Sequence, residues 1–234
     1  MTTKRRNQIV IGIIVVLTLC MGLTVYSLYQ NGKNNEQLKI MGEMDAEKII
    51  NRPAPSGEVV LEGAHFIVHE SEIQDMIERL SFLYDNDDNV PEQAVQYLAE
   101  LNSIYQTALE DGYDISEQDI SDAIEADKAT YEENGTSESF DVYIEAMGIT
   151  TQEYWELMQT DADYRRDIVV ERYLKDRQDA LYKDVEYEED SEEGDAAWQE
   201  HQRKLVHDAM QRENARIVSA DERYSDIDLY AERA

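Results

Sequence analysis

Two histidines have a spacing that occurs in metal sites. His65 and His69 lie four residues apart, and on a helix this spacing would place both imidazoles on one face. The residues from His65 to Val68 instead have the composition of a strand, in which positions four apart are separated by about 13 Å. No third ligand with metal-site spacing accompanies them, so the sequence predicts no metal site here.

An acidic run resembles the start of a calcium-binding loop. Asp85, Asp87 and Asn89 match the first three ligand positions. The sixth position, where such loops need glycine, is Val90, and the twelfth, where they need glutamate, is Gln96. The run is therefore predicted to be an acidic loop between two helices rather than a calcium site.

The sequence contains no catalytic or cofactor motif. It has no glycine-rich phosphate loop, no Gly-x-Ser-x-Gly and no metal-spaced cluster of cysteine and histidine, and its one cysteine, Cys20, lies in an apolar N-terminal run. Carboxylate pairs are uninformative among 52 acidic residues, although a hydrolase site built from them is the one catalytic alternative. We predict a non-enzyme with no catalytic, cofactor-binding or metal-binding residues.

The charge of the chain limits its partners. The formal net charge is -31, and the first 29 residues hold three basic residues and no acidic one. The rest therefore carries 18 basic against 52 acidic side chains. Such a surface repels nucleic acid, which we exclude as a partner. It predicts a hydrated, soluble surface, or alternatively a surface for basic partners or loosely held divalent cations.

The N-terminus has the pattern of a membrane anchor. Residues 9–29 are 21 residues without a charge, long enough to cross a hydrocarbon core of roughly 30 Å. Lys4, Arg5 and Arg6 precede them, and the positive-inside rule then places the N-terminus in the cytoplasm. We predict a single-pass protein of the cell membrane that contacts the bilayer through residues 9–29. The alternative is a cleaved signal peptide ending near Ser27.

A short corner between two helices is the most tightly specified stretch. Gly112 is typical of the residue that ends a helix. Ser116 is predicted to be the N-cap of the next helix, with Asp119 in the place of the glutamate of a capping box. Ile115 and Ile120 have the positions of a hydrophobic staple. The pattern predicts two helices joined by a well-defined turn.

The remaining patterns predict a mainly α-helical fold with a small element of two or three strands. Val59–Leu61 and His65–Val68 favour a strand pair, and residues 215–218 are a candidate third strand. A short helix is predicted over 39–51. Capping boxes at Ser71 and Thr150 begin further helices, the second running to about Tyr182. Trp155 and Trp198 are interpreted as core residues, with a client-binding groove as the alternative.

The order of these parts resembles the N-terminal domain of the SurA and PrsA family of extracytoplasmic chaperones. The resemblance covers residues 58–183, and its most specific parts are Glu110–Ile124 and Phe140–Tyr154. In that family a parvulin-type prolyl isomerase domain commonly follows, and a C-terminal helix and strand fold back onto the N-terminal domain. Here an acidic run replaces the isomerase domain, while Trp198–Val218 resembles the returning segment. The resemblance implies a chaperone frame without its enzyme, and it identifies no peptide-binding residue.

The predicted function is non-catalytic binding of unfolded or extended segments of exported polypeptides. The alternative is a scaffold or subunit that uses the same frame to bind one fixed membrane partner. The predicted organisation is a basic N-terminus at 1–8, a transmembrane helix at 9–29, a linker at 30–57, a chaperone-like domain at 58–183, an acidic linker at 184–195, a returning helix and strand at 196–219 and a frayed tail at 220–234.

Overall fold

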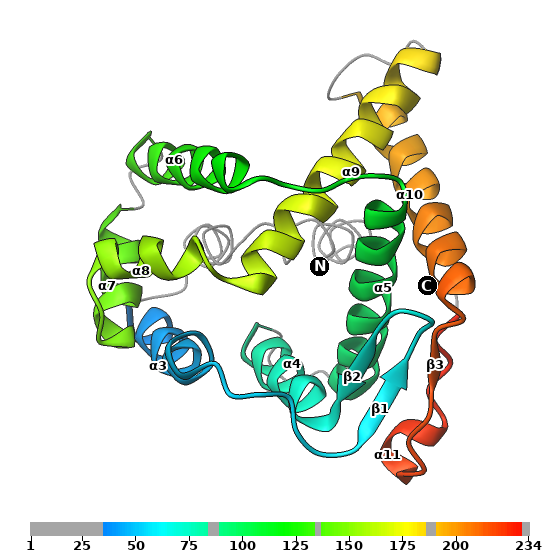
Figure 1. The fold of residues 1–234 in the computed structure, drawn as a ribbon, viewed down its shortest axis with the longest axis horizontal. Coiled ribbons are helices and arrows are strands. Elements are labelled where there is room, and N and C mark those ends of the chain that lie inside the picture. Colours follow the sequence, from blue (N-terminus) through cyan, green and yellow to red (C-terminus); the bar gives the residue numbers. More distant parts are fainter. Residues whose placement is uncertain (1–34, 84–88, 134–136, 186–190, 231–234) are drawn as a thin grey trace. The chain divides into compact units, whose positions relative to one another are not determined.

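A computed structural model describes residues 35–83, 89–133, 137–185 and 191–230. These residues are mainly helical and include one small antiparallel sheet (Figure 1), which confirms the fold class at this level. The helices are α3 (Asn35–Asn51), α4 (Glu70–Leu83), α5 (Val90–Glu110), α6 (Glu117–Glu133), α7 (Ser137–Met147), α8 (Thr151–Met158), α9 (Ala162–Val185), α10 (Glu192–Glu213) and α11 (Glu222–Ser225). The strands are β1 (Val59–Glu62), β2 (Ile67–His69) and β3 (Arg216–Ile217).

The chain divides into two compact units, and each is built from two separate stretches of sequence. Unit 1 combines the chain up to Pro53 with residues 113–172, so it contains α3, α6, α7, α8 and the first part of α9. Unit 2 combines residues 54–112 with the chain from Tyr173 onward, so it contains the sheet, α4, α5, the end of α9, α10 and α11. The segment 58–183 that resembles the chaperone domain is distributed over both units.

The predicted single-pass membrane localisation is contradicted. No helix among the described residues is both long and apolar enough to cross a bilayer. The 21-residue helix α5, for example, has sufficient length but carries Glu92, Glu100 and Glu110. The predicted span at residues 9–29 lies outside the described residues.

The corner at the start of α6 has the predicted geometry. Gly112 adopts a φ of +88°, which only glycine takes without strain. The Asp119 carboxylate accepts hydrogen bonds from the Ser116 amide and hydroxyl, and the Asp119 amide donates to that hydroxyl. The two hydrogen bonds that the carboxylate accepts from Ser116 lower the pKa of Asp119. Arg172 of α9, 2.8 Å from the carboxylate, lowers this pKa further. Ile115 and Ile120 are both buried, as the staple requires.

Residues 35–51, in the first part of the predicted linker, form α3, which packs on α7 (Figure 1). The short helix predicted over 39–51 is thus confirmed and begins four residues earlier, although the segment is polar on average. Its apolar residues Leu38, Met41 and Ile49 nevertheless recur at helical spacing and are buried. Asp45 lies on the same face and accepts a hydrogen bond of 2.9 Å from the buried Tyr143 hydroxyl.

The contact between α3 and α7 depends on the absence of a side chain at Gly42. A Cβ at this position would lie 2.4 Å from the carbonyl oxygen of Tyr143 and 2.8 Å from the Cβ of Ala146. The carbonyl oxygen belongs to the backbone of α7 and cannot rotate away. The two helices must therefore separate to accommodate any other residue.

We expect Gly42→Ala to lower the free energy of unfolding by about 1–3 kcal/mol, because overpacking outweighs the gain of about 1 kcal/mol in helix propensity. Urea unfolding followed by circular dichroism measures the change. Glu43→Ala is the matched control, since Glu43 is exposed on the same helix and its replacement is expected to change stability by less than about 0.5 kcal/mol. A Gly42→Ala protein more stable than the wild type would contradict the close approach.

The long helix predicted from Thr150 to Tyr182 is interrupted at residues 159–161. The capping box of Thr150 and Glu153 is confirmed at the start of α8. α9 then begins anew because the Asp161 carboxylate accepts a hydrogen bond from the Tyr164 amide at 2.8 Å. Arg52, at the end of α3, donates to the carbonyl oxygens of Leu157 and Thr160 at 2.9 and 3.1 Å. These bonds satisfy carbonyl groups that the helix would otherwise pair internally.

Unit 2 is organised around α5 and the sheet. All residues from Ala94 to Leu101 are buried, because α4, β1 and α10 pack against α5. The strand order is β2-β1-β3, and both pairs are antiparallel. The predicted third strand is thus confirmed, with Leu61 opposite Ile217 and Glu62 opposite Arg216.

The C-terminal residues expected to be frayed are ordered as far as residue 230. Tyr224 of α11 is 1% exposed and Leu229 is 8% exposed. The Tyr230 hydroxyl donates to the carbonyl oxygen of Met210 or Ala215, at 3.1 and 3.0 Å. The prediction failed because isolated apolar residues in a polar tail show no periodicity.

Candidate functional site

The turn between β1 and β2 brings His65 to the ends of two helices. Gly63 begins this turn and donates to the carbonyl oxygen of Phe66 at 2.9 Å. A Cβ on Gly63 would lie 2.3 Å from the Phe66 ring, so glycine permits the tight turn. The Ala64 amide donates to the carbonyl oxygen of Glu213, the last residue of α10, at 2.7 Å. Main-chain bonding thereby fixes the turn against the end of α10.

His65 and Glu213 form a two-point contact. The two Glu213 carboxylate oxygens face the His65 amide at 2.8 Å and its imidazole Nδ1 at 3.0 Å. The Glu213 side chain is only 1% exposed, whereas the His65 side chain is 59% exposed. Glu213 raises the pKa of His65, first through the hydrogen bond and then through its charge, and Glu110 adds a smaller effect.

Glu110, the last residue of α5, completes the cluster. Its Oε1 lies 4.0 Å from the imidazole Nδ1 of His65, and its Oε2 lies 3.3 Å from Arg212. One ligand atom from each of His65, Glu110 and Glu213 lies within 4.8 Å of the other two. This is the one group of its kind among the residues that the structure describes. We refer to these three residues as the His65 cluster.

The structure separates the two histidines whose spacing suggested a metal. The Nδ1 atom of His69 lies 3.2 Å from the carbonyl oxygen of Gly57. The His69 amide donates to the Glu72 carboxylate at 2.8 Å, and α4 begins at Glu70, before the N-cap predicted at Ser71. His65 therefore has carboxylate neighbours that are 45 and 148 residues distant in the sequence, and no local signal could identify them. The acidic run at Asp85–Asn89 lies mostly outside the described residues.

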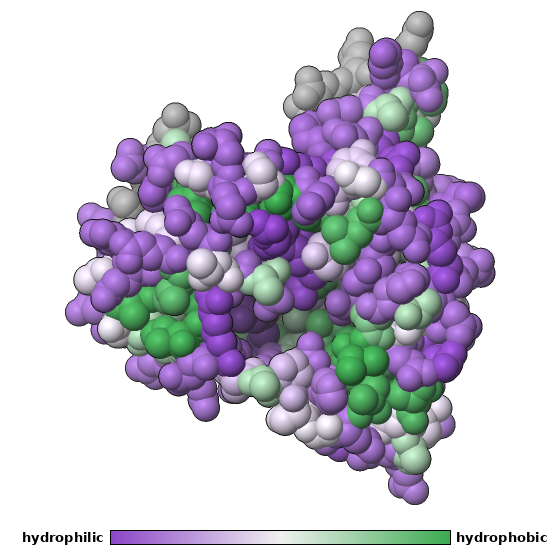
Figure 2. Space-filling model, viewed as in Figure 1, coloured by the Kyte–Doolittle hydropathy of each residue, from purple (hydrophilic) through white to green (hydrophobic). Residues whose placement is uncertain are grey.

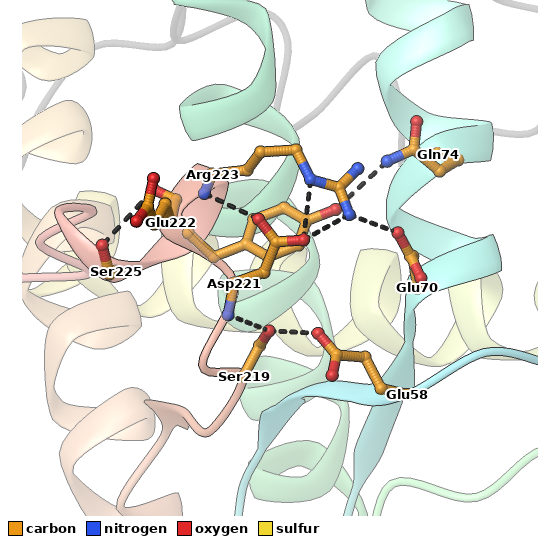
Figure 3. Close-up of polar contacts among 9 residues, drawn as sticks. Glu58, Glu70, Gln74, Ser219, Asp221, Glu222, Arg223 and Ser225 are labelled. Atoms are coloured by element: carbon orange, nitrogen blue, oxygen red, sulfur yellow. Dashed lines mark hydrogen bonds and ion pairs between the residues drawn. The ribbon is translucent and has the colours of Figure 1, made fainter.

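A second polar group connects the C-terminal residues to the first half of unit 2 (Figure 3). Arg223 forms ion pairs with Glu70 of α4 at 2.5 Å and with Asp221 at 2.7 Å. Ser219 donates to Glu58, just before β1. Asp221 has a lowered pKa because of its hydrogen bonds from Arg223. These side chains are on the surface, so each ion pair contributes little to stability.

Two apolar side chains in and beside the sheet are exposed. Ile67 is 57% exposed on β2, and Val218, just after β3, is 40% exposed. Figure 2 shows apolar surface gathered over β1 and β2. β2 is an edge of the sheet, with β1 as its one partner strand among the described elements. Exposed apolar residues on an edge strand are typical of surfaces that bind other polypeptides.

The two tryptophans do not contribute to such a surface. Trp155 and Trp198 are each 8% exposed, which confirms their interpretation as core residues. Trp155 packs with Phe140 and Tyr154 at ring-centroid distances of 5.5 and 4.9 Å in unit 1. The candidate functional features are therefore the His65 cluster and the sheet edge at Ile67. No protein-family model matches the chain, and no curated protein or solved structure shows significant similarity to it.

Proposed function

We propose that this protein binds unfolded or extended segments of other polypeptides and catalyses no reaction on them. The observation that carries the proposal is the edge strand β2, which presents Ile67 with 57% of its surface exposed. An extended segment added along β2 would form main-chain hydrogen bonds that do not depend on its sequence. Ile67 would contribute apolar contact. Such a mode suits many unrelated clients.

The arrangement of unit 2 supports the same proposal through the resemblance to the SurA and PrsA family. That resemblance implies that a C-terminal helix and strand fold back onto the earlier part of the chain. Here α10 packs on α5, and β3 pairs with β1. The strongly acidic composition favours solubility of a complex with an apolar client.

The full chain is expected to suppress the aggregation of several unrelated unfolded proteins at near-stoichiometric ratios, with no prolyl isomerase activity in parallel assays. Ile67→Ser is expected to weaken suppression several-fold, because it removes the exposed apolar contact. Light scattering of the diluted clients provides the measurement.

Ile40→Ser is the matched control, since Ile40 is 44% exposed but lies on α3 in unit 1. Equal losses in the two variants would reject the assignment to β2. Failure to suppress the aggregation of any client would reject general polypeptide binding and would favour a protein with one dedicated partner.

A further inference from the structure

We propose that His65, Glu110 and Glu213 form a binding site for a zinc-like divalent transition-metal ion. The three residues come from the β1–β2 turn and from the last positions of α5 and α10. A bound ion would therefore link three segments that are far apart in the sequence by coordinating one side chain from each. The inference does not depend on the proposed polypeptide binding.

The separations of the ligand atoms suit tetrahedral coordination. Zinc binds imidazole nitrogen and carboxylate oxygen at about 2.0–2.2 Å, which places neighbouring ligand atoms roughly 3.3–3.6 Å apart. The His65 Nδ1 atom lies 3.0 Å from one Glu213 oxygen and 4.0 Å from one Glu110 oxygen. These two distances bracket the required value, and the Glu110 and Glu213 ligand atoms lie within 4.8 Å of each other, so a bound ion would draw the carboxylate of the exposed Glu110 inward to complete three ligand positions. Water supplies the fourth, because His65 and Glu110 are half exposed.

The donor set selects the class of ion. Zinc binds both imidazole nitrogen and carboxylate oxygen, and imidazole also suits copper, iron and nickel. Calcium and magnesium prefer ligand sets made entirely of oxygen. The imidazole nitrogen therefore distinguishes this cluster from the many surface carboxylates of the chain, which offer only oxygen.

The surrounding charges permit a cation at the cluster. Two guanidinium groups, those of Arg177 and Arg212, lie near three carboxylates, those of Glu110, Asp111 and Glu213. Arg177 lies 2.6 Å from Asp111, and Arg212 contacts Glu110 at 3.3 Å and Asp111 at 4.0 Å. With His65 neutral, the group has a net charge of -1. Arg212 binds the Oε2 atom of Glu110, which leaves the Oε1 atom facing His65.

The buried carboxylate gives the site its rigidity. Glu213 is 1% exposed and is held by the His65 amide through its second oxygen. The Nδ1 atom of His65 faces the other Glu213 oxygen at 3.0 Å, so these two atoms already lie on the two sides of the place that the ion would take.

The test is a calorimetric titration of the full chain with Zn²⁺ in excess Mg²⁺, which occupies sites made of carboxylates alone. We expect one zinc site in the wild type. His65→Ala and Glu110→Gln should each weaken binding at least about tenfold. Glu110 is replaced instead of Glu213 because Glu110 is exposed, so its replacement leaves no buried group unpaired.

His69→Ala and His207→Ala are the matched controls, and both are expected to bind zinc with the affinity of the wild type. Long-range ¹H–¹⁵N spectra of the imidazoles should show the zinc-dependent shift at the Nδ1 atom of His65. Absence of zinc binding in excess Mg²⁺, or equal affinity in the wild type and His65→Ala, would overturn the proposal. So would a loss of binding confined to either control variant.

Discussion

Tyr224→Ala is expected to lower the free energy of unfolding by about 3–5 kcal/mol, the cost typical of removing a buried aromatic ring. Tyr224 is 1% exposed although it lies within ten residues of the end of the described chain. Its hydroxyl accepts a hydrogen bond of 3.1 Å from Gln74 of α4 (Figure 3). The ring thus anchors α11 to the earlier half of unit 2. Urea unfolding provides the measurement.

Two companion variants separate the contributions at this position. Tyr224→Phe retains the ring and removes the hydrogen bond from Gln74, so we expect a loss of about 0.5–1.5 kcal/mol. Arg223→Ala removes the neighbouring surface ion pairs with Glu70 and Asp221, and a much smaller loss than that of Tyr224→Ala is expected, because solvent screens exposed ion pairs. A Tyr224→Ala protein as stable as Arg223→Ala would show that α11 is not packed against unit 2.

Hydrogen exchange locates the effect of Tyr224→Ala. The C-terminal segment carries β3, which pairs with β1, and Ser219, which binds Glu58. We therefore expect the largest loss of amide protection in β1, β3 and α4. A uniform loss over the whole of both units would contradict a local anchoring role for the ring.

Local signals in the sequence predicted local structure well. The Ser116–Asp119 corner and the Thr150–Glu153 capping box each involve partners three residues apart. Gly112 adopts the positive φ that a glycine after a helix favours. The strand at 216–217 was predictable because Ile217 and Val218 are β-branched and follow the end of a helix. Such features depend on neighbouring residues, which a single sequence displays directly.

The features that were missed depend on partners distant in the sequence. Arg52 donates to two carbonyl groups at the break in the predicted long helix, more than 100 residues away. The helix before Arg52 was predicted, but its packing on α7 through a face that includes Leu38 and Met41 was not. Glu213 lies 148 residues from His65. In each case the sequence around the residue is equally compatible with a solvent-exposed side chain. Its contact depends on a partner that only the tertiary fold brings near.

The same limit applies to the candidate sites. His65 attracted attention because of its spacing from His69, whereas its structural neighbours are two carboxylates among the 52 acidic residues of the chain. Glu110 and Glu213 have no distinguishing local pattern except that each ends a helix. The position of a helix end was predictable, but the meeting of two such ends with one turn was not.

Asp167 is a buried acid whose charge opposes folding. It lies on α9 in unit 1 and is 8% exposed. Burial raises its pKa to about 8, and Arg166, whose Nε lies 3.4 Å from the carboxylate, only partly opposes this effect. The negative charges of Asp163 and Asp161 act in the same direction as burial. Asp167 therefore retains its proton in the folded protein at neutral pH.

This raised pKa determines how stability changes with pH. Between the ordinary aspartate pKa of 3.8 and the folded value of about 8, the folded state binds more protons at Asp167 than the unfolded state does. The contribution of Asp167 to stability is therefore greatest below pH 3.8, decreases as the pH rises through this range, and is constant above about pH 8.

Asp167→Asn is accordingly expected to stabilise the protein increasingly as the pH rises, by about 2–5 kcal/mol above pH 8 or so, and to change stability little in acid. The comparison of variant with wild type at each pH in urea unfolding cancels the titration of the other carboxylates. Asp179→Asn, an exposed position on the same helix, should show no such trend. If Asp167→Asn instead destabilises the protein at neutral pH, then the carboxylate is ionised and its pair with Arg166 outweighs the cost of burial.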